Sequence, residues 1–197
     1  MIRRSLAFAA TLVAALVLVG AALAAQVTIR VEGKTQTIFG SKPVAVDAAN
    51  PLQALDLAST LGEFYYGLTQ SSFGDYVSQI GKYAGAGSAG WVFKVDNLSP
   101  PVGADQVQLK DGDSVLWYYA DFGANGGPPT LDLKALPGNC YRVTSYDDAG
   151  KASPAAGAVL HVDGRRVKAV DGKGCVGTHR RLVRAFSFGT VRSNSAK

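Results

Sequence analysis

Two aromatic segments separated by turns constrain the fold of this chain most. In the stretch GWVFKVDNLSPPVGADQVQLKDGDSVLWYY, from Gly90 to Tyr119, bulky apolar side chains alternate over 91–95 and again over 115–119. A period of two is typical of β-strands, and Asp111-Gly112 is a strong turn signal before the second segment. The stretch contains no nucleophile elbow, phosphate loop or cluster of metal ligands. It therefore predicts a sheet with an aromatic face rather than a catalytic motif.

A hairpin and one helix are predicted ahead of these strands. Residues 26–39, QVTIRVEGKTQTIF, alternate apolar and polar positions on both sides of a turn that contains glycine, which favours a β-hairpin. Asn50 before Pro51 has the character of a helix N-cap with proline in the first turn. An apolar stripe at helical spacing follows and ends at Gly62. We therefore expect strands and a single helix in the first part of the chain.

Beyond residue 122 the pattern changes to short strands alone. Residues 123–129 are rich in glycine and proline and predict a linker. Turn signals then recur at regular intervals, which predicts a small all-β, sandwich-like domain over residues 130–197. The strands expected in it span residues 130–136, 140–146, 158–162, 165–169 and 181–186.

The first 25 residues predict export from the cytoplasm. Arg3 and Arg4 precede a long apolar run, and Ala22-Leu23-Ala24 offers the small residues of a cleavage site, as in a secretory signal peptide. The alternative is an uncleaved membrane anchor, because the uncharged stretch is long enough to span a bilayer. Both interpretations place the rest of the chain outside the membrane, secreted or at an extracytoplasmic surface, with bacterial export expected.

The two cysteines agree with such a location. Cys140 and Cys175 are the only cysteines of the chain, and an isolated pair in an oxidising compartment is most simply a disulfide. Two unpaired thiols are the alternative. A zinc site is disfavoured, because the two cysteines and two histidines lack the paired local spacing of such sites.

The first part of the chain resembles a known family over about residues 26–122. The helix opening at 51–57, SSFGDYV in the following loop, Gly90-Trp91, Val102-Gly103-Ala104 and Lys110-Asp111-Gly112-Asp113 together resemble the transcobalamin C-terminal-like domain. That family is also described as a domain of unknown function, related to soluble-ligand-binding β-grasp domains. The resemblance implies an α+β class, with a β-grasp domain in which a mixed sheet wraps one helix. It also implies a lid over a ring-bearing ligand, for which a corrinoid is one candidate. The helical domain that supplies most of a corrinoid site has no counterpart in this chain. The second domain resembles small immunoglobulin-like or carboxypeptidase-regulatory modules only loosely.

Aromatic side chains are the predicted ligand-binding residues. Rings among glycine and serine are typical of surfaces that hold a ligand or a protein, because they offer contact area at little cost in rotamer entropy. Tyr118 is expected to face away from its neighbours and to be exposed. The predicted ligand-binding set is Tyr65, Tyr66, Phe73, Tyr76, Tyr83, Trp91, Trp117 and Tyr118. The alternative for the strand residues is that they fill the core between sheet and helix.

Charge separates the two parts of the chain. Basic residues concentrate in the second domain and predict a patch for anionic envelope polymers, with a solvated surface as the alternative. The predicted patch comprises Arg165, Arg166, Lys168, Arg180, Arg181 and Arg184. Ser153, His161 and Asp163 could form a hydrolytic triad on paper, but no Gly-x-Ser-x-Gly motif accompanies them. We therefore expect a non-enzymatic binding protein whose partners are a small molecule or an envelope protein or polymer. The alternative is a structural or adhesive protein of the cell envelope. We expect no nucleic-acid partner and no metal, and membrane contact only through an uncleaved N-terminal segment.

Overall fold

A computed structural model describes residues 24–71, 74–124 and 126–197. The predicted signal peptide or anchor lies almost wholly outside these residues, and so does Phe73. No helix within the described ranges is both long enough and apolar enough to cross a membrane. The elements before residue 122 are β1 (Ala25–Glu32), β2 (Thr37–Ala48), α1 (Pro51–Leu61), β3 (Tyr66–Ser71), β4 (Gly74–Ile80), β5 (Tyr83–Ala84), β6 (Ala89–Val95) and β7 (Ser114–Asp121). Those after it are β8 (Thr130–Leu136), β9 (Cys140–Tyr146), β10 (Ala152–Pro154), β11 (Val159–Val162), β12 (Arg165–Lys168), β13 (Lys173–Cys175), β14 (Val183–Phe186) and β15 (Ser195–Ala196).

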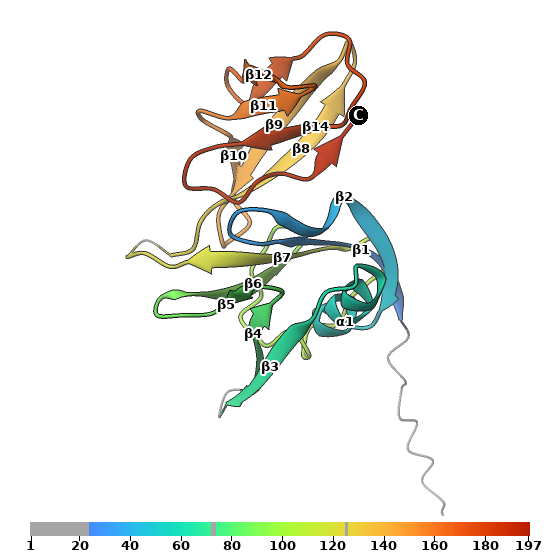
Figure 1. Cartoon of the computed structure of the whole chain (residues 1–197), viewed down its shortest axis with the longest axis vertical. Coiled ribbons are helices and arrows are strands. Elements are labelled where there is room, and N and C mark those ends of the chain that lie inside the picture. The colour runs from blue at the N-terminus through green and yellow to red at the C-terminus, as the bar shows by residue number, and fades with distance from the viewer. Residues whose placement is uncertain (1–23, 72–73, 125) are drawn as a thin grey trace, which may run out of the picture.

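The predicted hairpin opens a four-stranded sheet with the order β2-β1-β7-β6. β1 runs parallel to β7, while the other two pairings are antiparallel. Helix α1 packs against one face of this sheet (Figure 1). The side chain of Asn50 accepts the backbone N–H of Gln53, as a helix N-cap does. Val27, Ile29 and Val31 alternate along β1 and are buried in the core that includes the helix.

The predicted α+β class, with a β-grasp first domain, is wrong. Strands account for 52% and helix for only 7% of the residues that the structure describes, so this part of the protein is closer to all-β. One reason is the region after the helix, where the resemblance places a loop and the structure instead has a separate sheet in the order β3-β4-β5. The second half adds two further sheets and no helix, as its predicted all-β character requires.

The second half builds its own core from two four-stranded sheets. One contains β10, β9 and β13 with β8 also paired to β9, and the other has the order β12-β11-β14-β15. Leu131, Val143, Leu160 and Ala185 are among the residues buried between them. The predicted disulfide is confirmed, because Cys140 and Cys175 are bonded and lie opposite each other on β9 and β13. Closing this loop lowers the conformational entropy of the unfolded chain and so stabilises the fold by about 3–4 kcal/mol. The bond also indicates an oxidising compartment.

A buried carboxylate joins the two halves. Glu32, at the end of β1, is only 1% exposed, and it lies on the sheet face opposite the helix. Its carboxylate pairs with Arg30 at 3.1 Å, with Arg192 at 2.8 Å, and with Arg184. Arg30 also donates to the backbone carbonyl of Arg192 at 2.7 Å. Burial lowers the pKa of Arg30 and of Arg184, and the nearby Glu32 opposes that shift. One strand of the first half therefore supplies the anion that the second half surrounds.

A buried lysine makes a second connection. The ammonium of Lys94 on β6 donates to the carbonyl of Asp147 at 2.7 Å and to that of Tyr146 at 3.3 Å. It also lies 3.6 Å from the carboxylate of Asp148. Burial lowers the pKa of Lys94, and the charge of Asp148 opposes that shift. The turn after β9 is thus bound to the edge strand of the first sheet.

Replacing Glu32 tests how strongly the charge cluster holds the fold. We expect Glu32→Gln to lower the free energy of unfolding by about 3–5 kcal/mol, because three buried or half-buried arginines would lose their anion. Urea unfolding followed by circular dichroism measures this loss. The exposed Asp47, on the neighbouring strand β2, provides the control: Asp47→Asn should change stability by less than about 0.5 kcal/mol. Equal stability of both variants would contradict the role given to Glu32.

Candidate functional site

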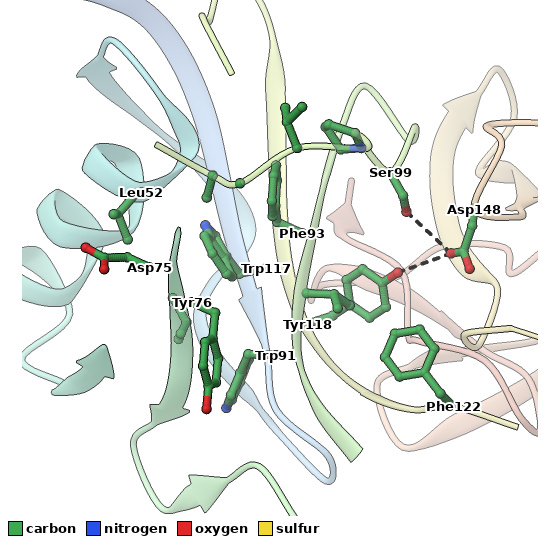
Figure 2. A pocket seen from close by; sticks show the side chains of 16 residues that line it. Leu52, Asp75, Tyr76, Trp91, Phe93, Ser99, Trp117, Tyr118, Phe122 and Asp148 are labelled. Carbon is green, nitrogen blue, oxygen red and sulfur yellow. Dashed lines mark hydrogen bonds between the residues drawn. The ribbon is translucent and has the colours of Figure 1, made fainter. Parts of the chain in front are cut away.

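An aromatic cleft of about 350 Å³ lies at the edge of the first sheet. Strands β4 and β6 form two of its walls, and the segment 99–104 forms another (Figure 2). Its lining includes six aromatic residues, namely Tyr76, Trp91, Phe93, Trp117, Tyr118 and Phe122. Leu52 of the helix and Val102 add aliphatic surface. Such a volume and such a lining are typical of small-ligand sites.

Hydrogen bonds fix the two tryptophans in this wall. The indole N–H of Trp91 donates to the carbonyl of Tyr83 at 2.7 Å, and that of Trp117 donates to the carbonyl of Pro51 at 3.0 Å. The ring of Trp117 also packs on Phe93 at a centroid distance of 5.2 Å. Because both indoles are anchored, the aromatic wall is preorganised and would lose little entropy on binding.

Two carboxylates are the charged groups of the cleft. Asp75 is exposed on β4, and Asp148 comes from the second half of the chain. Asp148 accepts hydrogen bonds from Ser99 and from the hydroxyl of Tyr118, each at 3.4 Å (Figure 2). Burial, together with the charge of Asp148, raises the pKa of Tyr118. This phenol therefore stays neutral and can donate at physiological pH.

Four of the predicted ligand-binding residues line this cleft: Tyr76, Trp91, Trp117 and Tyr118. The expectation that Tyr118 is exposed is wrong, because its side chain is only 1% exposed. It does point away from Trp117, but Lys94 and the second half of the chain cover that face. Phe122 and Asp148 are lining residues that sequence reasoning missed. Nothing local in the sequence relates them to β6.

The other predicted aromatic residues lie elsewhere. Tyr65 is 62% exposed, and its hydroxyl accepts a hydrogen bond from Gln79 at 2.7 Å. Tyr66 donates to the carboxylate of Asp56 at 3.0 Å, and burial raises its pKa. The ring of Tyr83 covers Gly33, where a Cβ atom would come within 2.5 Å of it. These three side chains are not part of the cleft lining.

The basic residues divide into two groups. Arg165, Arg166, Lys168, Arg180 and Arg181 are exposed on the second half of the chain, as predicted for a patch. Arg184 is not part of an exposed patch, because its guanidinium is bound to Glu32. A hollow of about 360 Å³ lies among His161, Asp163, Arg166 and Arg181. Asp163 accepts the backbone N–H groups of Arg180 and Arg181, which lowers its pKa.

Ser153, His161 and Asp163, considered above as a hydrolytic triad, do not contact one another in a triad but have other neighbours. The ring of His161 packs on Phe186 at a centroid distance of 4.4 Å. Asp163 is occupied by the backbone groups just described, and Ser153 lies on β10 in the other sheet. Among the residues that the structure describes, no three His, Cys, Asp or Glu side chains are grouped so as to hold a metal ion.

Comparison with known proteins adds a family likeness. Residues 52–121 match a family described as a domain of unknown function (DUF4430), so the chain is similar to that family over 52–121. A search of curated proteins finds no match. Among solved structures, one similar chain is a protein from Ruminococcus gnavus ATCC 29149 described as a candidate metal-binding protein. That chain shares 14% identity and a TM-score of 0.38, over 49% of this chain and 97% of its own length. A likeness this weak supports no conclusion about fold or function.

His161 gives a pH dependence that can be measured. Burial, and then the charge of Arg166, lowers the pKa of its imidazole below the usual value of about 6.5. The unfolded chain therefore binds a proton more readily than the folded chain. This contribution to stability is complete above about pH 6.5 and is lost as the pH falls toward the folded pKa. We expect the free energy of unfolding to fall less steeply between pH 7.5 and pH 5.5 in His161→Gln than in the parent. Urea titrations at several pH values measure both slopes, and identical slopes would contradict this assignment.

Proposed function

We propose that this chain is an exported, non-enzymatic binding protein whose aromatic cleft holds a small, apolar, ring-bearing ligand. The observation that carries the proposal is the convergence of six aromatic side chains on one cleft of about 350 Å³. Flat rings stack on such walls with offset or edge-to-face contacts, each of which adds roughly 0.5–1.5 kcal/mol beyond its buried area. The exposed carboxylate of Asp75 supplies a polar group that can orient a ligand in such a site.

The size of the cleft bears on the nature of the ligand. The resemblance to transcobalamin C-terminal-like domains supports a role in holding a ring-bearing molecule. A corrinoid, with its macrocycle and side arms, is larger than this cleft and would place only one edge inside it. A ligand of one or two fused rings suits the volume better.

Export is part of the proposal. The disulfide supports an oxidising compartment, and the sequence of residues 1–25 has the order of a secretory signal.

The two tryptophans report on occupancy of the cleft. The chain has only these two, so an NMR spectrum of ¹⁵N-labelled protein should contain two indole N–H signals. We expect 2-naphthol to shift both signals saturably. Tyr76→Ala should weaken its affinity roughly two- to tenfold, because one stacking contact is lost.

Tyr65 provides the matched control for Tyr76. Both tyrosines are more than half exposed, at 62% and 52%, but only Tyr76 lines the cleft. Tyr65→Ala should therefore leave the affinity unchanged. Flat titrations with 2-naphthol and with cyanocobalamin would contradict the proposal, and so would equal losses in the two variants.

A second candidate function is attachment to anionic polymers of the cell envelope. The observation that favours it is the hollow of about 360 Å³ beside the exposed Arg166 and Arg181. Neither guanidinium donates a hydrogen bond to another residue in the described part of the chain, so both are available to an anion.

Retention on immobilised dextran sulfate tests this candidate. We expect the parent protein to elute at a higher salt concentration than Arg166→Ala combined with Arg181→Ala, because exposed charge contacts are screened by salt. Lys34→Ala combined with Lys42→Ala removes the same charge from exposed positions outside the hollow and should shift elution less. Elution of the parent without retention at low salt would exclude the candidate.

A further inference from the structure

The cleft surrounds an open strand edge. β6 is the last strand of its sheet, and its ladder pairs it with β7 alone. At the two ends of this ladder, the N–H of Asp96 donates to the carbonyl of Ser114 and that of Phe122 donates to the carbonyl of Ser88. In these two bonds the backbone groups of Asp96 and Ser88 point toward β7, so the backbone groups of the even-numbered residues of β6 do the same. Since backbone groups alternate along an antiparallel strand, the N–H and C=O groups of Trp91 and Phe93 point the other way.

Local bridges close both ends of this edge but leave its middle open. Ala89 exchanges backbone hydrogen bonds with Ala86, and Val95 does so with Leu98. Among the described residues, no backbone hydrogen bond joins Trp91 or Phe93 to a strand on their outer side. Proteins usually block such edges, because an open one can pair with another chain. Here the open stretch lies within the wall of the cleft.

Residues of both faces of β6 line the cleft. Trp91 and Phe93 contribute from the face that packs toward the helix, and Val92 contributes from the opposite face. Figure 2 shows Phe93 and Trp117 on one side of this strand and Tyr118 on the other. A strand added to β6 would direct alternate side chains to these two apolar surfaces. A simple ring compound would fill part of the apolar space but would leave the backbone groups unpaired.

We propose that the occupant of the cleft is an extended peptide segment of a partner protein, which adds to the open edge of β6 and inserts an aromatic side chain between the rings. This inference rests on the proposed function and changes one part of it: the ring that the cleft holds is a side chain of a partner protein and not a free small molecule. The charge of the cleft indicates which residues flank the aromatic side chain in this segment. Asp75 is an exposed carboxylate in the lining, and no Lys or Arg is present among the described lining residues. The segment therefore carries a lysine or arginine beside its aromatic residue.

A backbone N-methyl scan separates strand addition from ring binding. The probe is the peptide acetyl-Lys-Val-Tyr-Val-Lys-amide, titrated into the full chain while the two indole N–H signals are followed. We expect it to bind at least about tenfold more tightly than N-acetyltyrosinamide. N-methylation should weaken binding about tenfold at residues of one parity, where the N–H faces β6, and little at the other parity.

The outcomes distinguish this inference from the proposed function. If N-acetyltyrosinamide binds as tightly as the peptide, or if methylation has no alternating effect, the inference is overturned while the ring-binding function stands. If neither compound binds and 2-naphthol also fails, both are overturned. A concentration-dependent dimer of the protein alone that excludes the peptide would mean that a second copy occupies the edge, which would also overturn the inference.

Removing the charge of Asp75 tests whether basic residues flank the aromatic residue of the peptide. At low salt, Asp75→Asn should weaken binding of the lysine-flanked peptide about two- to fivefold, as expected for an exposed ion pair. It should not affect acetyl-Ala-Val-Tyr-Val-Ala-amide. Asp105→Asn is the matched control, because Asp105 is an exposed carboxylate outside the lining. Equal effects of the two substitutions on the lysine-flanked peptide would overturn the charge assignment.

Discussion

The structure depends on one carboxylate that is removed from water. Glu32 lies on the central strand pair of the first sheet, and its charge is balanced by one arginine of the same strand and two of the second half. Leaving such a charge without partners would cost several kcal/mol, so the two halves must meet in one arrangement. The apolar face of β1 packs in the core with the helix, and its polar face forms ion pairs and hydrogen bonds with the second half. Both faces of a single strand are therefore buried, for different physical reasons.

The cleft is a consequence of that arrangement. Lys94 holds the turn after β9 against the edge strand, and this turn brings Asp148 to the cleft. The wall that contains Tyr118 and Phe122 is thus completed by a residue from beyond the linker. The remaining walls belong to the first half alone, where anchored indoles and the segment 99–104 define the apolar space. An isolated first half would lack part of the site.

Local signals in the sequence predicted local structure well. The hairpin at Glu32-Gly33, the helix cap at Asn50 and most strands of the second half are where alternation and turn residues indicated. The disulfide followed from composition and is confirmed. Alternation tells which residues share a face, but not what covers that face. Tyr118 and Arg184 were therefore assigned to the surface, although the second half buries Tyr118 and Glu32 of the first half neutralises Arg184. The fold class was wrong because it rested on one clear helix and a family resemblance, which placed a loop where the structure has the sheet β3-β4-β5.

The position of Asp148 has a thermodynamic consequence. One oxygen of this carboxylate both faces the ammonium of Lys94 and accepts the hydroxyl of Tyr118. Any occupant that draws the phenol away changes the field felt by the lysine, and hence the free energy that keeps the two halves together. The reverse holds to the same extent, because coupling between two equilibria is reciprocal. Occupancy of the cleft and the strength of the contact between the two halves are in this way thermodynamically linked.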